Sequence, residues 1–271
     1  MLKSDNSAMC NESQTRDKRM FSAIQSQLGG ARPLRPRPQK VAPESLKRLC
    51  CDHLFKELEK MNSRTADVSF QTLSAFLNDS IAHLSAEEVD AVAEVLCESA
   101  LCHDNAQLVV DLLVASAHLS SLKSAFSASL MERIPEFIFE EEHPSLPDLM
   151  ARILVARFPR PFNRSTDTSS EILYTILSTL KGWIGALCDE DDEEGASQMR
   201  ARCAEGIVDL CMTAKRRLWV CWPEIVDEMY EAIQNVLTGN VVMSKEAKKK
   251  LLDLFVQINS WPNAVVKRRN Q

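Results

Sequence analysis

Apolar residues recur at intervals of three and four along most of this chain, in one segment after another. That spacing places them on one face of an α-helix, so each segment predicts an amphipathic helix with one buried side. No segment shows sustained alternation of apolar and polar residues, so we expect no strand. The ten expected helices cover approximately residues 43–61, 65–84, 85–100, 104–119, 122–139, 146–158, 171–187, 201–220, 223–238 and 244–261.

Capping residues and prolines mark the ends of these segments. A small polar residue followed three positions later by Glu or Gln is typical of a helix start, and proline suits the first helical position. Glycine is expected just past a helix end, as at Gly239 after the ninth segment. The expected helix starts are marked by Ser85 with Glu88, Asp104 with Gln107, Pro147, Pro223 and Ser244.

The number of helices predicts a repeat architecture. Ten helices within residues 44–261 give about 43 residues per pair, inside the roughly 40 to 47 of HEAT or armadillo pairs. We therefore expect an all-α fold, a right-handed solenoid of about five HEAT-like antiparallel helix pairs. Each pair would bury its apolar face only against its neighbours, so residues 44–262 would form one domain.

Two tails are expected to flank this domain. Residues 1–43 are polar, and Arg32, Arg35 and Arg37 are interleaved with prolines that favour an extended polyproline II conformation. This stretch is either a plain linker or a short linear motif that folds onto a partner. Residues 263–271 form a basic C-terminal tail. The net charge of −6 therefore conceals basic ends around an acidic middle, which suggests protein partners of matching charge and also RNA.

Motifs of catalysis and metal binding are missing from the sequence. Glycine makes up only 7 of 271 residues, and no P-loop, dinucleotide fingerprint or nucleophile elbow occurs. Vicinal Cys50 and Cys51 near His53 lie about 100° apart on a helix, so both cannot face one metal. We interpret Cys97, Cys102 and His103 as core packing. The sequence predicts no enzyme, no metal, no cofactor and no small-molecule substrate.

The acidic run at residues 189–194 is expected to be a solvated, mobile loop, because six consecutive carboxylates repel one another. No apolar run approaches the roughly 18 to 20 residues that span a bilayer, and the N-terminus lacks a secretory signal. Nine scattered cysteines fit a reducing compartment. We therefore expect no membrane association and a cytoplasmic protein, with the nucleus as a second compartment.

The best candidate for a binding surface lies between the eighth and ninth expected helices. Three consecutive cations, Lys215, Arg216 and Arg217, adjoin Trp219 and Trp222 there. Exposed bases beside tryptophan are common at protein interfaces, and the same mixture could stack a nucleobase. The alternative is that the indoles pack in the core and the bases are merely solvated.

Two stretches resemble a known family. Val89–Leu101, followed by Leu108–Leu119, is similar to an early helix pair of the middle domain of eukaryotic translation initiation factor 4G. Met243–Trp261, with its serine cap and terminal tryptophan, is similar to the last helix of that domain. The family's central Asn-Phe-Ile stretch has no match around Leu149–Phe158, so no helicase-binding residues are assigned here.

This resemblance, over about residues 44–262, implies a five-pair HEAT-type module. A compact chain of this kind looks like the small adaptors of the family. The implied function is that of a non-enzymatic adaptor in translation regulation, which bridges an mRNA-bound protein to the initiation machinery. The implied partners are translation initiation factors or an mRNA-binding protein. The alternatives are a HEAT-type scaffold in transport or mRNA decay, and a protein that binds RNA directly.

Overall fold

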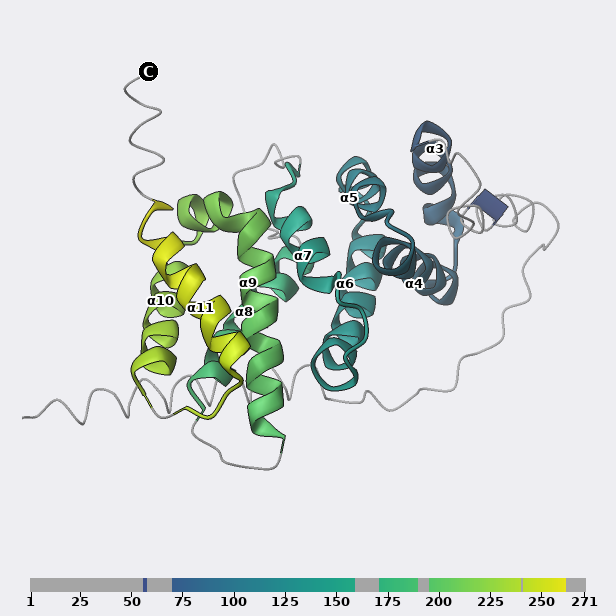
Figure 1. Ribbon diagram of the computed structural model, residues 1–271. Helices are drawn as coiled ribbons and strands as arrows, with labels where there is room; N and C mark the ends of the chain where they lie inside the picture. Colours follow the sequence, from purple (N-terminus) through teal and green to yellow (C-terminus); the bar gives the residue numbers. More distant parts are fainter. Residues whose placement is uncertain (1–55, 58–69, 159–170, 190–194, 240, 262–271) are drawn as a thin grey trace, which may run out of the picture. The chain divides into compact units, whose positions relative to one another are not determined.

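The computed structural model describes residues 56–57, 70–158, 171–189, 195–239 and 241–261 (Figure 1). The described residues are mostly helical and include no strand, which confirms the all-α class. All of them belong to one compact unit, Ser45–Gln271. Both tails, most of the first expected helix and residues 190–194 lie outside the described residues.

Nine α-helices account for the described part of the chain, and they match the second to tenth expected helices. The longest, α9, begins about five residues earlier than expected, directly after Gly195, which adopts a left-handed conformation with φ 94°. The bounds are α3 Phe70–Ser80, α4 Ala86–Cys102, α5 Ala106–Ala115, α6 Ser120–Pro135, α7 Leu146–Val155, α8 Glu171–Leu187, α9 Ala196–Cys221, α10 Pro223–Thr238 and α11 Lys245–Ile258.

Two short helical turns complete the set. A 3₁₀ turn, η1, covers Ile81–His83 after α3, and a π-helical turn, η2, covers Glu136–Glu140 after α6. The π turn begins directly after Pro135. Because proline has no N–H to donate to the preceding turn, the regular α-helical hydrogen bonding is interrupted at this point.

Alternate helices pack against one another in two rows. In one row α3 contacts α5, α5 contacts α7, α7 contacts α9, and α9 contacts α11; in the other, α4 contacts α6, α6 contacts α8, and α8 contacts α10. Contacts between successive helices, such as α8 with α9 and α10 with α11, join the rows (Figure 1). Each helix therefore buries its apolar face mainly against helices close to it in the sequence.

The two expected serine caps are both confirmed. Ser85 and Glu88 form a complete capping box: the Glu88 carboxylate accepts from the Ser85 N–H at 2.7 Å, and the Ser85 hydroxyl accepts from the Glu88 N–H at 3.3 Å. Ser244 caps α11, with its hydroxyl oxygen 3.2 Å from the Ala247 nitrogen. These interactions satisfy N–H groups that have no partner within the helix.

One expected cap is wrong, and one expected helix end is confirmed. Asp104 adopts a left-handed conformation with φ 58° that reverses the chain after α4, so Asn105 takes the cap position of α5 without a side-chain cap. Gly239 lies directly after the last residue of α10, as expected, in an extended conformation with φ −91° and ψ 179°. A Cβ atom at Gly239 would lie 2.7 Å from the Asn235 carbonyl oxygen, so close approach explains the glycine.

A close contact within the core lies where α8 meets α9. Trp183 is buried on α8 and packs against Phe137, with ring centroids 5.6 Å apart. Gly206 on α9 leaves room for this indole, because a Cβ atom there would lie 2.7 Å from a carbon of the Trp183 ring. Trp261, at the end of the last expected helix, is only 7 % exposed and packs in the same core.

Candidate partner-binding surface

The five residues predicted to bind a partner lie on the last two turns of α9 and at its junction with α10. The buried residues Ala214 and Leu218 fix the inner face of α9 here, so the residues between them turn towards solvent. We call the group the α9-end surface; it consists of Lys215, Arg216, Arg217, Trp219 and Trp222.

The junction between the two helices is tightly hydrogen-bonded. Trp222 is both the last cap of α9 and the first cap of α10, and its N–H donates to the Leu218 carbonyl at 2.8 Å. Its own carbonyl accepts from Ile225 at 3.1 Å, and Pro223 starts α10 at the expected position. The surface is therefore carried by a rigid junction, so little conformational entropy would be lost on binding.

The side chains of this surface differ in exposure. Lys215 and Arg216 are exposed, whereas Arg217, Trp219 and Trp222 are half-buried. The Arg217 guanidinium carbon lies 5.9 Å from the centre of the Trp222 ring, a cation–π contact. Both indoles also pack against the core. The predicted surface thus presents two exposed cations beside two half-buried indoles. This arrangement lies between the two interpretations of the sequence, which have the indoles either exposed for binding or packed in the core.

Sequence reasoning missed an apolar addition to this surface. Val220 is 61 % exposed and lies next to Trp219 on the last turn of α9. A large exposed aliphatic side chain beside cations supplies contact area that charge alone does not. The signal was present in the sequence, but single exposed valines are too common on protein surfaces to be recognised without the structure.

The arginines of the possible linear motif, Arg32, Arg35 and Arg37, lie outside the described residues, as do Cys50, Cys51 and His53.

The interpretation of Cys97, Cys102 and His103 as core packing is right in part. Cys97 is fully buried, and burial raises the pKa of its thiol to about 11. Cys102, in contrast, is exposed at the end of α4, so its assignment to the core is wrong.

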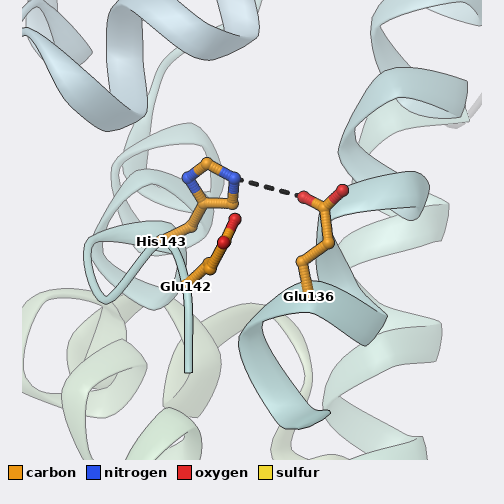
Figure 2. Close-up of side chains that lie close together, drawn as sticks. All are labelled: Glu136, Glu142 and His143. Carbon is orange, nitrogen blue, oxygen red and sulfur yellow. Dashed lines mark ion pairs between the residues drawn. The ribbon is translucent and has the colours of Figure 1, made fainter. Parts of the chain in front are cut away.

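A second cluster, which sequence reasoning did not identify, forms beside Cys102. Figure 2 shows Glu136, Glu142 and His143 turned towards one another. The His143 Nε2 atom lies 3.1 Å from a carboxylate oxygen of Glu136, and one ligand atom from each of the three residues falls within a span of 4.8 Å. The π turn and the left-handed conformation of His143, with φ 52°, bring these positions together.

An imidazole with two carboxylates is a donor set that divalent metals accept. Here, however, Arg133 already binds Glu136: its Nη1 atom lies 3.0 and 3.1 Å from the two carboxylate oxygens. Arg133 also reaches Glu94 on α4 at 3.7 Å. The guanidinium supplies the positive charge that a metal would bring, so we interpret the cluster as an ion-pair network that ties the end of α6 to α4.

Among the described helices, none combines the length and apolar character that crossing a bilayer requires.

A protein-family model described as a repeat of unknown function (DUF7627) matches residues 54–269. The chain belongs to this family. The DUF7627 match includes α3 to α11 and therefore the whole α9-end surface. No curated protein and no solved structure matches the chain.

Proposed function

We propose that this protein is a non-enzymatic adaptor in the regulation of mRNA translation, which bridges an mRNA-bound protein to the initiation machinery. We further propose that its helices form the right-handed solenoid of about five HEAT-like pairs that the sequence predicts. The packing of every second helix in two rows supports this architecture, as does the family's description as a repeat. Stacked helix pairs of this kind serve as extended binding surfaces.

The observation that carries the adaptor function is the α9-end surface. Lys215 and Arg216 project from a helix whose end is fixed by backbone hydrogen bonds, next to the half-buried indoles of Trp219 and Trp222. Exposed cations attract an acidic partner from a distance, and the aromatic base with Val220 provides apolar contact once it arrives. A translation initiation factor or an mRNA-binding protein with an acidic face is the proposed partner.

The state of the indoles favours a protein partner over RNA at this surface. Stacking a nucleobase requires an exposed ring face. Trp222 is half-buried and has the Arg217 guanidinium over its ring, and Trp219 is half-buried against the core. The exposed parts of the two rings can therefore contribute contact area to a protein interface. They do not offer the open ring face on which a nucleobase would stack.

The test is quantitative affinity purification of the tagged full-length protein from cells, after nuclease treatment. We expect initiation factors to co-purify, and the double variant Lys215→Glu/Arg216→Glu to reduce their recovery about tenfold or more, because charge reversal repels an acidic partner. Both side chains are exposed, so the variant should fold normally. The matched control is Lys245→Glu/Lys249→Glu on α11, which makes the same charge change at two exposed positions.

Each outcome bears on a different part of the proposal. If the wild-type protein recovers transport or decay factors and no initiation factors, the proposed role in translation is wrong and a role in transport or decay takes its place. Initiation factors retained by the Lys215→Glu/Arg216→Glu variant would show that they bind elsewhere. Equal losses in this variant and in the α11 control would mean that net charge, and not the α9-end surface, controls binding.

A further inference from the structure

An open groove lies between α5, α7 and α9, apart from the α9-end surface. It has a volume of about 470 Å³, within the range of sites that hold a few side chains. None of the five residues of the α9-end surface lines it. Three helices of the same row contribute its walls: Gln107, Val110, Asp111 and Val114 from α5, Thr213 from α9, and Arg152, Val155, Ala156 and Arg157 from the end of α7 and the residues after it.

The floor of the groove is apolar. Val110 is almost completely buried, Val114 and Ala156 are half-buried, and Val155 is 44 % exposed at the last position of α7. The chain leaves the helical path at Ala156, whose ψ of 146° is extended. Because α7 ends here while α9 continues to Cys221, Val114 and Val155 are left partly uncovered. An aliphatic side chain would gain stabilisation by covering them.

Two guanidinium groups form one side of the groove. The Nε atom of Arg152 donates to Asp148 at 2.6 Å, and the other Asp148 oxygen accepts from Thr213 at 3.1 Å. This chain of contacts fixes the Arg152 side chain by its Nε atom, and no described residue hydrogen-bonds its Nη atoms. Arg157 is exposed and pairs with no carboxylate among the described residues.

The wall that α5 contributes has the other charge. Asp111 on α5 accepts a hydrogen bond from Gln107 at 3.0 Å through one carboxylate oxygen, and it is exposed. A ligand across the groove therefore meets hydrogen-bond donors at α7 and an acceptor at α5. An extended peptide fits this polarity, since its carboxylate side chain can bind the arginine fork and its backbone N–H groups can face Asp111.

We propose that this groove binds a short extended segment of a partner protein in which an acidic residue adjoins an aliphatic one. The carboxylate lies against the Nη atoms of Arg152 and beside Arg157, and the aliphatic side chain covers Val114 and Val155. The pre-positioned Arg152 side chain loses little rotamer freedom on binding. The site goes beyond the proposed adaptor function and does not depend on translation as the process.

The test is a display selection of random octapeptides on the full-length protein. We expect the enriched sequences to place Asp or Glu next to Leu, Ile or Val. A fluorescein-labelled enriched peptide would then be titrated and its fluorescence anisotropy measured. Arg157→Glu should weaken binding about tenfold or more, since it reverses a charge beside the carboxylate. Val155→Asp should weaken it similarly, because an aspartate removes the apolar floor and repels the ligand.

The controls separate this site from the α9-end surface. Lys249→Glu on α11 and Lys215→Glu/Arg216→Glu should leave the affinity for the peptide unchanged within error. Arg157→Glu should in turn leave the recovery of initiation factors unchanged. A selection that yields no binder, enriched peptides without the acidic–aliphatic pair, or an affinity unaffected by Arg157→Glu in a variant with normal circular dichroism would overturn the proposal.

Discussion

Replacing Gly206 with alanine tests the packing of α8 on α9. The added Cβ atom would lie 2.7 Å from Cζ3 and 3.0 Å from Cε3 and Cη2 of Trp183. The indole is 2 % exposed and packs against Phe137 on another side, so it cannot move away without disturbing the core. Overpacking of this kind typically costs about 1 to 3 kcal/mol.

Helix propensity acts in the opposite direction. Alanine is favoured over glycine in a helix interior by about 1 kcal/mol, so Gly206→Ala should lower the free energy of unfolding by roughly 1 kcal/mol in total. Gly185 on α8 is the matched control, because it is exposed and a Cβ atom there meets nothing within 4 Å. Gly185→Ala should therefore raise the free energy of unfolding by up to about 1 kcal/mol.

Urea denaturation followed by far-ultraviolet circular dichroism measures both effects. The midpoint should move to lower urea for Gly206→Ala and to higher urea for Gly185→Ala, with the slope unchanged. In a Trp183→Phe background the smaller ring should make Gly206→Ala less costly, a coupling that a double-mutant cycle detects. Equal shifts for the two alanine variants, or no coupling to Trp183, would refute the close contact between α8 and α9.

Three further predictions follow from burial and composition. Trp261→Ala should lower the free energy of unfolding by roughly 3 to 5 kcal/mol, whereas Trp261→Phe should cost less because the buried Nε1 atom has no hydrogen-bond partner among the described residues; near-wild-type stability of Trp261→Ala would place the indole outside the core. Burial raises the pKa of Cys97 to about 11 and those of Cys203 and Cys211 to about 12. As the pH rises, the unfolded chain loses its thiol protons before the folded chain does, so the free energy of unfolding should fall above about pH 9. Cys203→Ala should make this fall shallower, and an unchanged dependence of the free energy on pH would contradict the prediction. Removal of residues 1–43 should leave the melting temperature within a few degrees of the full chain, and a large drop would show that the tail packs on the helices.

The helices could be predicted from the sequence because each carries its own signal. The capping box at Ser85 and the proline at Pro223 act within a few residues of their own positions, so the pattern of residues is sufficient. The failure at Asp104 arises from backbone geometry between helices. There, a left-handed conformation competes with the expected cap, and the sequence does not indicate which one prevails.

The candidate sites show the same limit. The cations and indoles of the α9-end surface are neighbours in sequence, so they could be found before the structure was known. The contact of His143 with Glu136 depends on a π turn, and the groove depends on helices that begin at Ala106, Leu146 and Ala196. Side chains from distant segments meet only because the two rows of helices pack together, and no local sequence motif indicates that packing.

The central claim is that this protein connects an mRNA to the initiation machinery through the α9-end surface. The most direct measurement is a tethering assay, in which the full-length protein is fused to an RNA-binding coat protein and recruited to a reporter mRNA. The quantity measured is reporter protein per reporter mRNA. We predict that the wild-type fusion changes this ratio, that Lys215→Glu/Arg216→Glu abolishes the change, and that Lys245→Glu/Lys249→Glu preserves it. A wild-type fusion that leaves the ratio unaltered, or a change that survives the Lys215→Glu/Arg216→Glu variant, would contradict the claim.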